Sequence, residues 1–114
     1  MRENPFTTFD PKECGILADA IEKGIENNPD VREISYAFLY KEAGVEKISG
    51  ACAIGYGLLS CFDIEILSSS FEILDGIYLA NKLQIPKMLC LTASSEHFDK
   101  RMTAKEIIQA LRAV

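Results

Sequence analysis

The sequence predicts an α+β fold that is mostly helical, with about four helices and a short antiparallel β-hairpin after the first helix. Three observations predict it: a capped amphipathic stretch at residues 11–27, an alternating run from residue 34 to residue 48, and further capped helix starts near residues 69 and 103. The 114 residues fit one globular domain, 1–114, and 48% hydrophobic with 25% charged residues is an ordinary composition for such a domain. Residues 1–9 show no clear periodicity, so we expect that segment to be flexible.

The first helix is predicted over residues 11–27. Asp10 precedes Pro11, a residue favoured at the first helical position, and Glu13 completes a capping box three residues after the cap. Less polar residues follow at helical spacing: Cys14, Leu17, Ala18, Ile21 and Ile25. Pro29 ends the helix, because the residue before a proline avoids helical dihedral angles.

The β-hairpin is predicted from two adjacent runs. Residues 34–40 (ISYAFLY) place Ile, Tyr, Phe and Tyr on one face, which is typical of a β-strand. Residues 41–44 are the expected turn, and residues 45–48 are the expected returning strand. Because an isolated hairpin is only marginally stable in water, we expect it to lie against helices.

Residues 50–60 (GACAIGYGLLS) form a small-residue segment that we predict to be buried. Ile54, Leu58 and Leu59 share one helical face, which favours a short helix, or the start of one, that neighbouring backbone approaches closely. Each interior glycine lowers helix propensity by about 1 kcal/mol relative to Ala, so a packing or ligand reason must offset it. A glycine-bearing strand with a bulge is the alternative.

Two more capped helices are predicted in the second half of the chain. Ser69 and Glu72 begin one that ends near residues 81–83, and its apolar stripe consists of Phe71, Leu74, Ile77 and Tyr78. Thr103 and Glu106 begin the last helix, which presents Ala104, Ile107, Ile108 and Leu111 on one face. Between them, residues 87–92 (KMLCLT) are an apolar run that periodicity assigns to neither helix nor strand, and residues 93–100 are polar and loop-like.

Charge and cysteine content narrow the function classes. A net charge of −5 with scattered basic residues argues against nucleic acid as a partner, because such binding needs clustered Lys and Arg. No run is long enough for a membrane helix, and the first residues, MRENPFTTF, lack the apolar stretch of a signal peptide. Cys52 and Cys90 lie among apolar residues, so we expect a reduced, cytoplasmic protein whose acidic surface suits a protein partner or a homodimer.

The glycines define one candidate ligand site, at Gly55, Tyr56 and Gly57. Gly50 and Gly55 are spaced like the glycines of a P-loop, but Tyr56 and Gly57 stand where that motif has Lys and then Ser or Thr. The P-loop interpretation therefore fails. A small-ligand pocket near Gly55 and Gly57, where backbone N–H groups can be approached closely, and simple close packing are the two interpretations that remain.

Cys52 and His97 are the candidate catalytic pair. His97 is the only histidine, so any Cys–His dyad must use it, and a helix N-terminus beside Cys52 would activate the thiol. The alternative is a buried structural cysteine and an exposed histidine in a loop. The cysteines also lack the closely spaced ligand pairs of zinc sites, so we expect no metal and no cofactor.

The aromatic residues of the first strand are the candidate partner-binding site. If Tyr36, Phe38 and Tyr40 lay on the exposed side of the hairpin, they would form a sticky patch; otherwise they pack on the helices. Since no catalytic groups are assembled in the sequence, the leading prediction is a small binding or regulatory protein that acts through protein–protein contacts. The ligand pocket and the thiol enzyme are the alternatives.

Several short segments together resemble a family of uncharacterised small bacterial and phage proteins. Its members have an N-terminal helix, a short hairpin, a Cys-Ala-Leu-Gly-type core segment and a closing helix after a Thr. Here Cys52-Ala53-Ile54-Gly55 is similar to the core segment, and residues 103–108 are similar to the closing helix, so the resemblance spans residues 12–113. The Asn-Asp pair that the family often carries is replaced by residues 92–95 (TASS), and the family's function is unknown.

Overall fold

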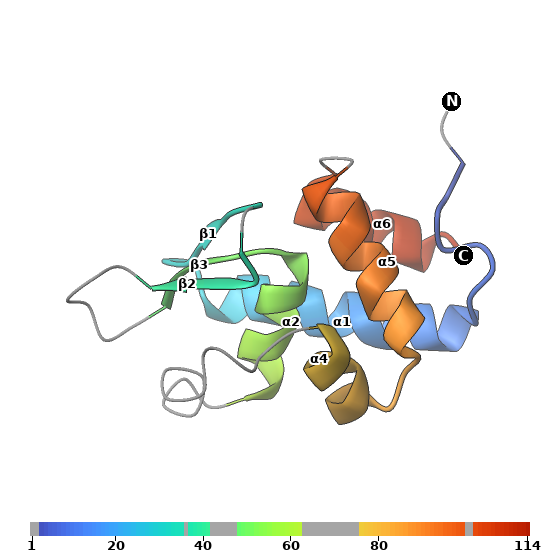
Figure 1. Cartoon of the computed structure of the whole chain (residues 1–114), viewed down its shortest axis with the longest axis horizontal. Coiled ribbons are helices and arrows are strands. Elements are labelled where there is room, and N and C mark those ends of the chain that lie inside the picture. Colours follow the sequence, from blue (N-terminus) through green and yellow to red (C-terminus); the bar gives the residue numbers. More distant parts are fainter. Residues whose placement is uncertain (1–2, 36, 42–47, 63–75, 100–101) are drawn as a thin grey trace.

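A computed structural model describes residues 3–35, 37–41, 48–62, 76–99 and 102–114. It confirms the α+β class, with five helices rather than about four in these residues and a small three-stranded sheet. The elements in chain order are α1 (Pro11–Asn27), β1 (Arg32–Glu33), β2 (Leu39–Lys41), β3 (Ile48–Ala51), α2 (Ala53–Cys61), α4 (Gly76–Leu83), α5 (Lys87–Phe98) and α6 (Ala104–Arg112). Figure 1 shows the sheet at one end of the molecule and α5 and α6 toward the other, with α1 running along both.

The sheet has the order β1-β3-β2, with β1 parallel and β2 antiparallel to β3. The predicted hairpin is therefore present as β2 and β3, but the predicted single strand 34–40 is wrong. The chain pairs with one side of β3 at residues 32–33 and with the other side at residues 39–41, so it must cross over the end of β3 between them. A continuous strand cannot make that crossing. The returning strand extends to Ala51, while residues 42–47, including most of the predicted turn, lie outside the described residues.

Helix α1 is confirmed over residues 11–27. The Asp10 carboxylate accepts hydrogen bonds from the backbone N–H groups of Lys12 (2.7 Å) and Glu13 (3.4 Å). The buried side carries five apolar or small residues of the helix and one glycine: Cys14, Leu17, Ala18, Ala20, Ile21 and Gly24. This side packs against α2 and α6, so α1 forms one wall of the core.

The small-residue segment divides between a strand and a helix. Gly50 and Ala51 belong to β3, and α2 begins at Ala53 with Cys52 as its N-cap. A Cβ added to Gly55 would lie 1.8 Å from the carbonyl oxygen of Phe38, which no side chain can accommodate. The expected close approach of neighbouring backbone is therefore present at Gly55.

A second close contact fixes α1 on α2. A Cβ on Gly24 would lie 1.8 Å from the carbonyl oxygen of Tyr56, whereas one on Gly57 would lie 2.7 Å from the side chain of Leu79. These glycines lower the helix propensity, but they allow short interhelical distances that larger residues would prevent.

Helix α4 ends at Leu83, as predicted, but its buried face differs from the predicted stripe. Ile77 and Tyr78 are 39% and 40% exposed, while Gly76, Leu79 and Ala80 are buried. The reason is the contact with α5, where Gly76 faces Cys90 closely enough that an added Cβ would lie 3.6 Å from the Cys90 side chain. The predicted start of this helix, with Ser69, Glu72, Phe71 and Leu74, lies outside the described residues.

Residues 87–98 form the single helix α5, so the loop predicted from residue 93 is wrong as far as Phe98. The buried residues of α5 recur at helical spacing: Leu89, Cys90, Ala93, Ser94, Glu96 and His97. Three of the six are polar, so a search for apolar periodicity misses the helix. Its N-cap, Pro86, makes no side-chain cap bond that the sequence could have revealed.

Helix α6 is confirmed with its capping box and its buried face, Ala104, Ile107, Ile108 and Leu111. Ahead of α1, Phe6 is fully buried, and the Asn4 side chain donates a hydrogen bond to the carbonyl oxygen of Ala110 (2.7 Å). These two contacts hold the N-terminal segment against the end of α6.

Candidate functional site

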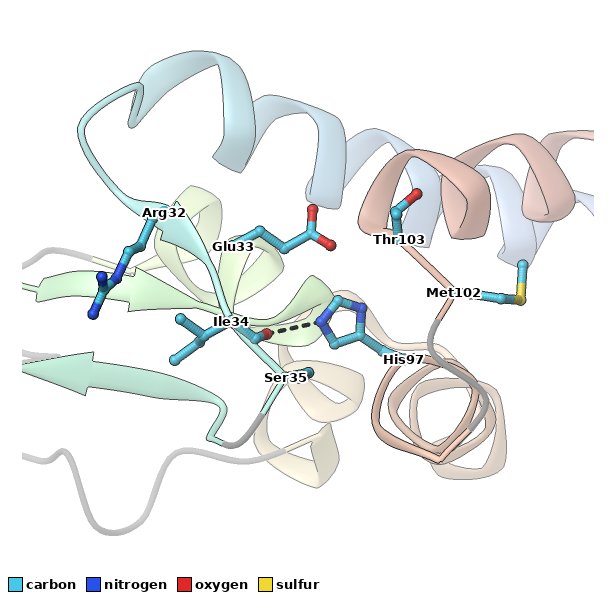
Figure 2. Close-up of a pocket in the computed structure, with 7 residues that line it drawn as sticks. All are labelled: Arg32, Glu33, Ile34, Ser35, His97, Met102 and Thr103. Carbon is cyan, nitrogen blue, oxygen red and sulfur yellow. Dashed lines mark hydrogen bonds between the residues drawn. The ribbon is translucent and has the colours of Figure 1, made fainter.

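A pocket of about 460 Å³ opens where the end of β1, the end of α5 and the start of α6 meet. Its lining, drawn in Figure 2 and called the His97 pocket below, consists of Arg32, Glu33, Ile34, Ser35, His97, Met102 and Thr103. These residues come from two stretches of the chain that are far apart in the sequence, residues 32–35 on one side and residues 97, 102 and 103 on the other. The pocket therefore exists only in the folded chain.

His97 lies in the last turn of α5 and is only 3% exposed. Its Nε2 lies 2.8 Å from the carbonyl oxygen of Ile34. A carbonyl oxygen can only accept, so Nε2 carries a hydrogen and donates it. This bond ties the last turn of α5 to the chain that leaves β1.

The second ring nitrogen, Nδ1, is buried and has no hydrogen-bond partner among the described residues. A buried polar atom without a partner destabilises a protein by about 1–3 kcal/mol. Most buried polar groups are satisfied, and the exceptions often have a functional reason. The His97 ring is thus held by a hydrogen bond at Nε2, while Nδ1 makes none with the described residues.

Aromatic packing holds the His97 ring in place. Its centroid lies 5.8 Å from that of Phe98, with an angle of 71° between the ring planes. Phe98 in turn makes an edge contact with Phe38, at 5.7 Å and 78°. The orientation of the imidazole is thus set by the core as well as by Ile34.

Glu33 connects β1 to the start of α6. Its Oε2 accepts a hydrogen bond from the backbone N–H of Ala104 (3.1 Å), the first residue of α6. Thr103 supplies the local cap, since its Oγ1 accepts from the N–H of Glu106 (3.1 Å). The carboxylate also interacts favourably with the positive end of the helix dipole. Glu33 is therefore a second cap, contributed from across the pocket.

The two charged side chains of the pocket point in different directions. Figure 2 shows the Glu33 carboxylate turned toward Thr103, whereas the Arg32 guanidinium points away from it. The Ile34 side chain packs near Gly50, and the unbranched Met102 forms part of the opposite wall. The polar groups that lie on the same side of the lining are the Glu33 carboxylate and the His97 imidazole.

The predicted thiol site is not assembled in this structure. Cys52 is fully buried, and its Sγ accepts a hydrogen bond from the N–H of Gly55 (3.4 Å) rather than from an imidazole. Burial raises the pKa of the Cys52 thiol to about 11, so it stays protonated at neutral pH, whereas a nucleophilic thiol needs a lowered pKa. No hydrogen bond between described residues joins Cys52 to His97, and His97 lies in a buried helical turn rather than in the exposed loop that we expected.

The predicted glycine site is filled by the protein itself. The space beside Gly55 is taken by the carbonyl of Phe38, and the space beside Gly57 is taken by Leu79. Tyr56 is 4% exposed, and its hydroxyl donates a hydrogen bond to the carbonyl oxygen of Val31 (2.7 Å). These three residues pack the core, and the His97 pocket is lined by other residues.

The predicted aromatic patch is divided. Tyr36 lies outside the described residues, Phe38 is half-buried against Phe98, and Tyr40 is half-buried on β2. Phe38 thus packs against Phe98, which in turn contacts the His97 ring, and it does not form an outer surface.

The sequence pattern predicts a different role for His97 and does not reveal Glu33, Ile34 and Thr103 as its neighbours. The available signal was the spacing of Leu89, Ala93 and His97, each four residues from the next, which is typical of one helix face. The partners of His97 gave no local signal, because Ile34 lies 63 residues away in the chain.

The described residues form neither a metal-binding cluster nor a membrane-spanning helix. Within the part of the chain that the structure describes, no three His, Cys, Asp or Glu side chains gather in a way that could hold a metal ion. None of the described helices combines the length and the hydropathy that crossing a bilayer requires.

Comparison with family models, with curated proteins and with solved structures finds no match to the chain.

Proposed function

We propose that this protein is a small regulatory binding protein that takes up a small polar molecule in the His97 pocket. The observation that carries the proposal is the His97 ring, whose Nε2 is fixed by Ile34 while its buried Nδ1 has no partner among the described residues. This is the ligand-pocket alternative of the sequence analysis, moved from Gly55–Gly57 to a different part of the molecule.

The protonation state of the ring defines what Nδ1 can do. Because Nε2 donates its hydrogen to Ile34, a neutral His97 carries a bare lone pair on Nδ1. A ligand with an N–H or O–H group would satisfy that lone pair. Such a ligand would remove the free-energy cost of the unpaired Nδ1, which destabilises the ligand-free protein.

Access to Nδ1 requires a small movement of the pocket wall. His97 is 3% exposed, so its ring is nearly covered. Met102 lines the pocket and has an unbranched side chain that changes conformation easily. We expect the side chains that cover the ring to shift when the ligand enters.

Binding fits the site better than catalysis does. Among the described residues of the lining, the hydroxyl groups that could act as nucleophiles belong to Ser35 and Thr103. Thr103 uses its Oγ1 as a helix cap, and no hydrogen bond between described residues links Ser35 to the imidazole. A nucleophile without a base in contact is not activated.

The test is a thermal-shift screen of small polar metabolites with matched variants. His97→Gln keeps an N–H donor for the Ile34 carbonyl but lacks an atom at the Nδ1 position. We expect at least one metabolite to raise the melting temperature of the wild type and of the surface control Gln109→Ala, and to leave His97→Gln unchanged. A metabolite shift of equal size in all three proteins would place the binding elsewhere, and the absence of any shift would reject the proposal.

A second candidate function is the protein–protein contact expected from the sequence, in the form of self-association through α5. Met88 is 61% exposed and Leu91 is 38% exposed, and a spacing of three residues puts them on one face of α5. Light scattering after size-exclusion chromatography tests it, with Met88→Lys/Leu91→Lys as the variant. A dimer that the double substitution converts to a monomer supports this function, and a wild-type monomer contradicts it.

Two further expectations are kept as proposals. The four cysteines are free, which supports a reducing, cytoplasmic location. The resemblance to small bacterial and phage proteins is kept on the segments that carry it, Cys52–Gly55 and residues 103–108.

A further inference from the structure

We infer that the His97 pocket selects a small aliphatic amine, whose ammonium group lies between the Glu33 carboxylate and Nδ1 of His97. This inference rests on the proposed function, because it names the ligand class of the same pocket. It follows from the balance of hydrogen-bond donors and acceptors, from the charges and from the shape of the lining.

The inward-facing groups are acceptors. A neutral His97 presents the lone pair of Nδ1, since Nε2 donates to Ile34. The Glu33 carboxylate only accepts, and one of its oxygens already receives the N–H of Ala104. Its other oxygen receives no hydrogen bond from a described residue. An ammonium group, with three N–H donors and no acceptor, matches this set.

The charges favour a cation over an anion. Among the described residues of the lining, Arg32 is the one basic side chain besides His97, and it points away from Glu33 in Figure 2. The last turn of α5 contributes the negative end of a helix dipole at His97. The positive end of α6 is already occupied, because Glu33 accepts from Ala104 and Thr103 accepts from Glu106. An anion would have to displace the Glu33 carboxylate, whereas a cation would pair with it.

The size and the walls of the pocket describe the rest of the ligand. A volume of about 460 Å³ is much larger than an ammonium ion requires. The larger part of the surface that lines the pocket is apolar. A short alkyl chain attached to the amino group would cover this apolar part.

The experiment compares three probes that differ only in the head group: n-butylamine, n-butanol and butyrate. Each is titrated at neutral pH into wild type and into Glu33→Gln, Glu33→Asp and Arg32→Gln, with affinity measured by calorimetry. Glu33→Gln keeps an oxygen for the N–H of Ala104 but removes the charge, and Glu33→Asp keeps the charge on a shorter side chain. Melting temperatures show whether each variant is folded.

We expect wild type to bind n-butylamine at least tenfold more tightly than n-butanol and to bind butyrate weakest, since a hydrogen bond to a charged group is worth about that factor or more. Glu33→Gln should weaken amine binding about tenfold and leave the alcohol unchanged. Glu33→Asp should retain part of the preference, and Arg32→Gln should not lower amine affinity.

Three results would overturn the inference. Equal or tighter binding of butanol or butyrate, or an amine affinity that Glu33→Gln does not change, would show that the pocket binds ligands of another class and would leave the proposed function standing. If none of the three probes binds to wild type, and if His97→Gln retains the metabolite shifts in melting temperature, both the amine inference and the proposed function of the His97 pocket are rejected.

Discussion

At the scale of single residues, the His97 side chain joins the fold to the candidate function. Its Nε2 holds the last turn of α5 on the Ile34 carbonyl, and its Nδ1 faces no described partner. Nε2 thus has a structural role, whereas Nδ1 makes no hydrogen bond with a described residue. A substitution that keeps an N–H donor in place of Nε2 but has no atom in place of Nδ1 separates the two nitrogens.

We expect His97→Gln to be nearly as stable as wild type and His97→Ala to be less stable by about 2–4 kcal/mol. The glutamine amide can still donate to Ile34, whereas alanine leaves both a cavity and an unpaired carbonyl. Urea unfolding followed by circular dichroism measures the difference. Equal losses for both variants would show that the Nε2 bond does not stabilise α5.

The cysteines give a second prediction at this scale. Burial raises the pKa of Cys14, of Cys52 to about 11 and of Cys90 to about 12, whereas Cys61 is only half-buried. At neutral pH iodoacetamide should therefore modify Cys61 first, and the other three only at the rate at which the protein unfolds. Mass spectrometry of the timed reaction measures the order. Early labelling of Cys52 would revive the thiol-enzyme alternative.

At the scale of helices and strands, close contacts between backbones decide how α2 is placed. Gly55 lies against the Phe38 carbonyl and Gly24 lies against the Tyr56 carbonyl, so the α1–α2 distance and the position of β2 depend on missing side chains. Gly15, also in α1, has nothing within 4 Å of the place where a Cβ would stand. Gly15 is therefore a control position at which a glycine-to-alanine substitution meets no neighbouring atom.

We expect Gly55→Ala to destabilise the protein by more than about 3 kcal/mol or to prevent folding, because backbone must move to admit the methyl group. Gly15→Ala should stabilise it by about 0.5–1 kcal/mol through helix propensity. Thermal unfolding of both variants gives the comparison. A Gly55→Ala protein that melts with the wild type would contradict the packing described for α2.

The start of α6 has two caps, one local and one distant. We expect Thr103→Ala to lower the free energy of unfolding by about 1 kcal/mol, and Glu33→Ala to lower it by a similar amount through the lost contact with Ala104. Hydrogen exchange at the first turn of α6 should rise in both variants. Unchanged exchange in Glu33→Ala would mean that the carboxylate does not hold the helix.

At the scale of the whole molecule, the sequence predicts the parts whose signals are local. Helices α1 and α6 carry their caps, Asp10 and Thr103, next to their apolar stripes, and both were predicted with the correct starts. Helix α5 lacks a side-chain cap and buries three polar residues, so the sequence pattern beyond residue 92 predicts a loop where the structure has a helix.

The sheet crossing and the pocket depend on contacts between distant residues. The strand order places β3 between β1 and β2, which no alternation of residues 34–40 encodes. The pocket joins Glu33 to Ala104, which are 71 residues apart. The glycine segment was correctly predicted to be closely packed, but what fills the space beside it, Phe38 and Leu79, comes from other parts of the chain.

The buried thiols make the stability of the whole protein sensitive to alkali. The folded pKa of Cys52, about 11, lies above the ordinary value of 9.0, so the folded state holds its proton more tightly than the unfolded state does. This contribution is complete below pH 9.0 and is lost as the pH rises toward about 11. We expect the free energy of unfolding to fall by about 2 kcal/mol from this thiol between about pH 8 and about pH 10.5.

Cys52→Ser is the matched variant for that measurement, because a serine hydroxyl can also accept the N–H of Gly55 and does not ionise in this range. Urea unfolding at several alkaline pH values should give a shallower decline for Cys52→Ser than for wild type. Parallel declines would show that the Cys52 thiol is not responsible.

The most direct test of the central claim is the nitrogen NMR spectrum of the histidine ring, which is unambiguous because His97 is the only histidine in the chain. Without ligand, the spectrum should show the ring hydrogen on Nε2, where the Ile34 carbonyl oxygen accepts it. Saturation with a ligand from the metabolite screen, or with n-butylamine, should move the Nδ1 signal strongly and leave Nε2 bonded to Ile34. A ring with its hydrogen on Nδ1, or an Nδ1 signal that does not change while the ligand binds, would contradict the account.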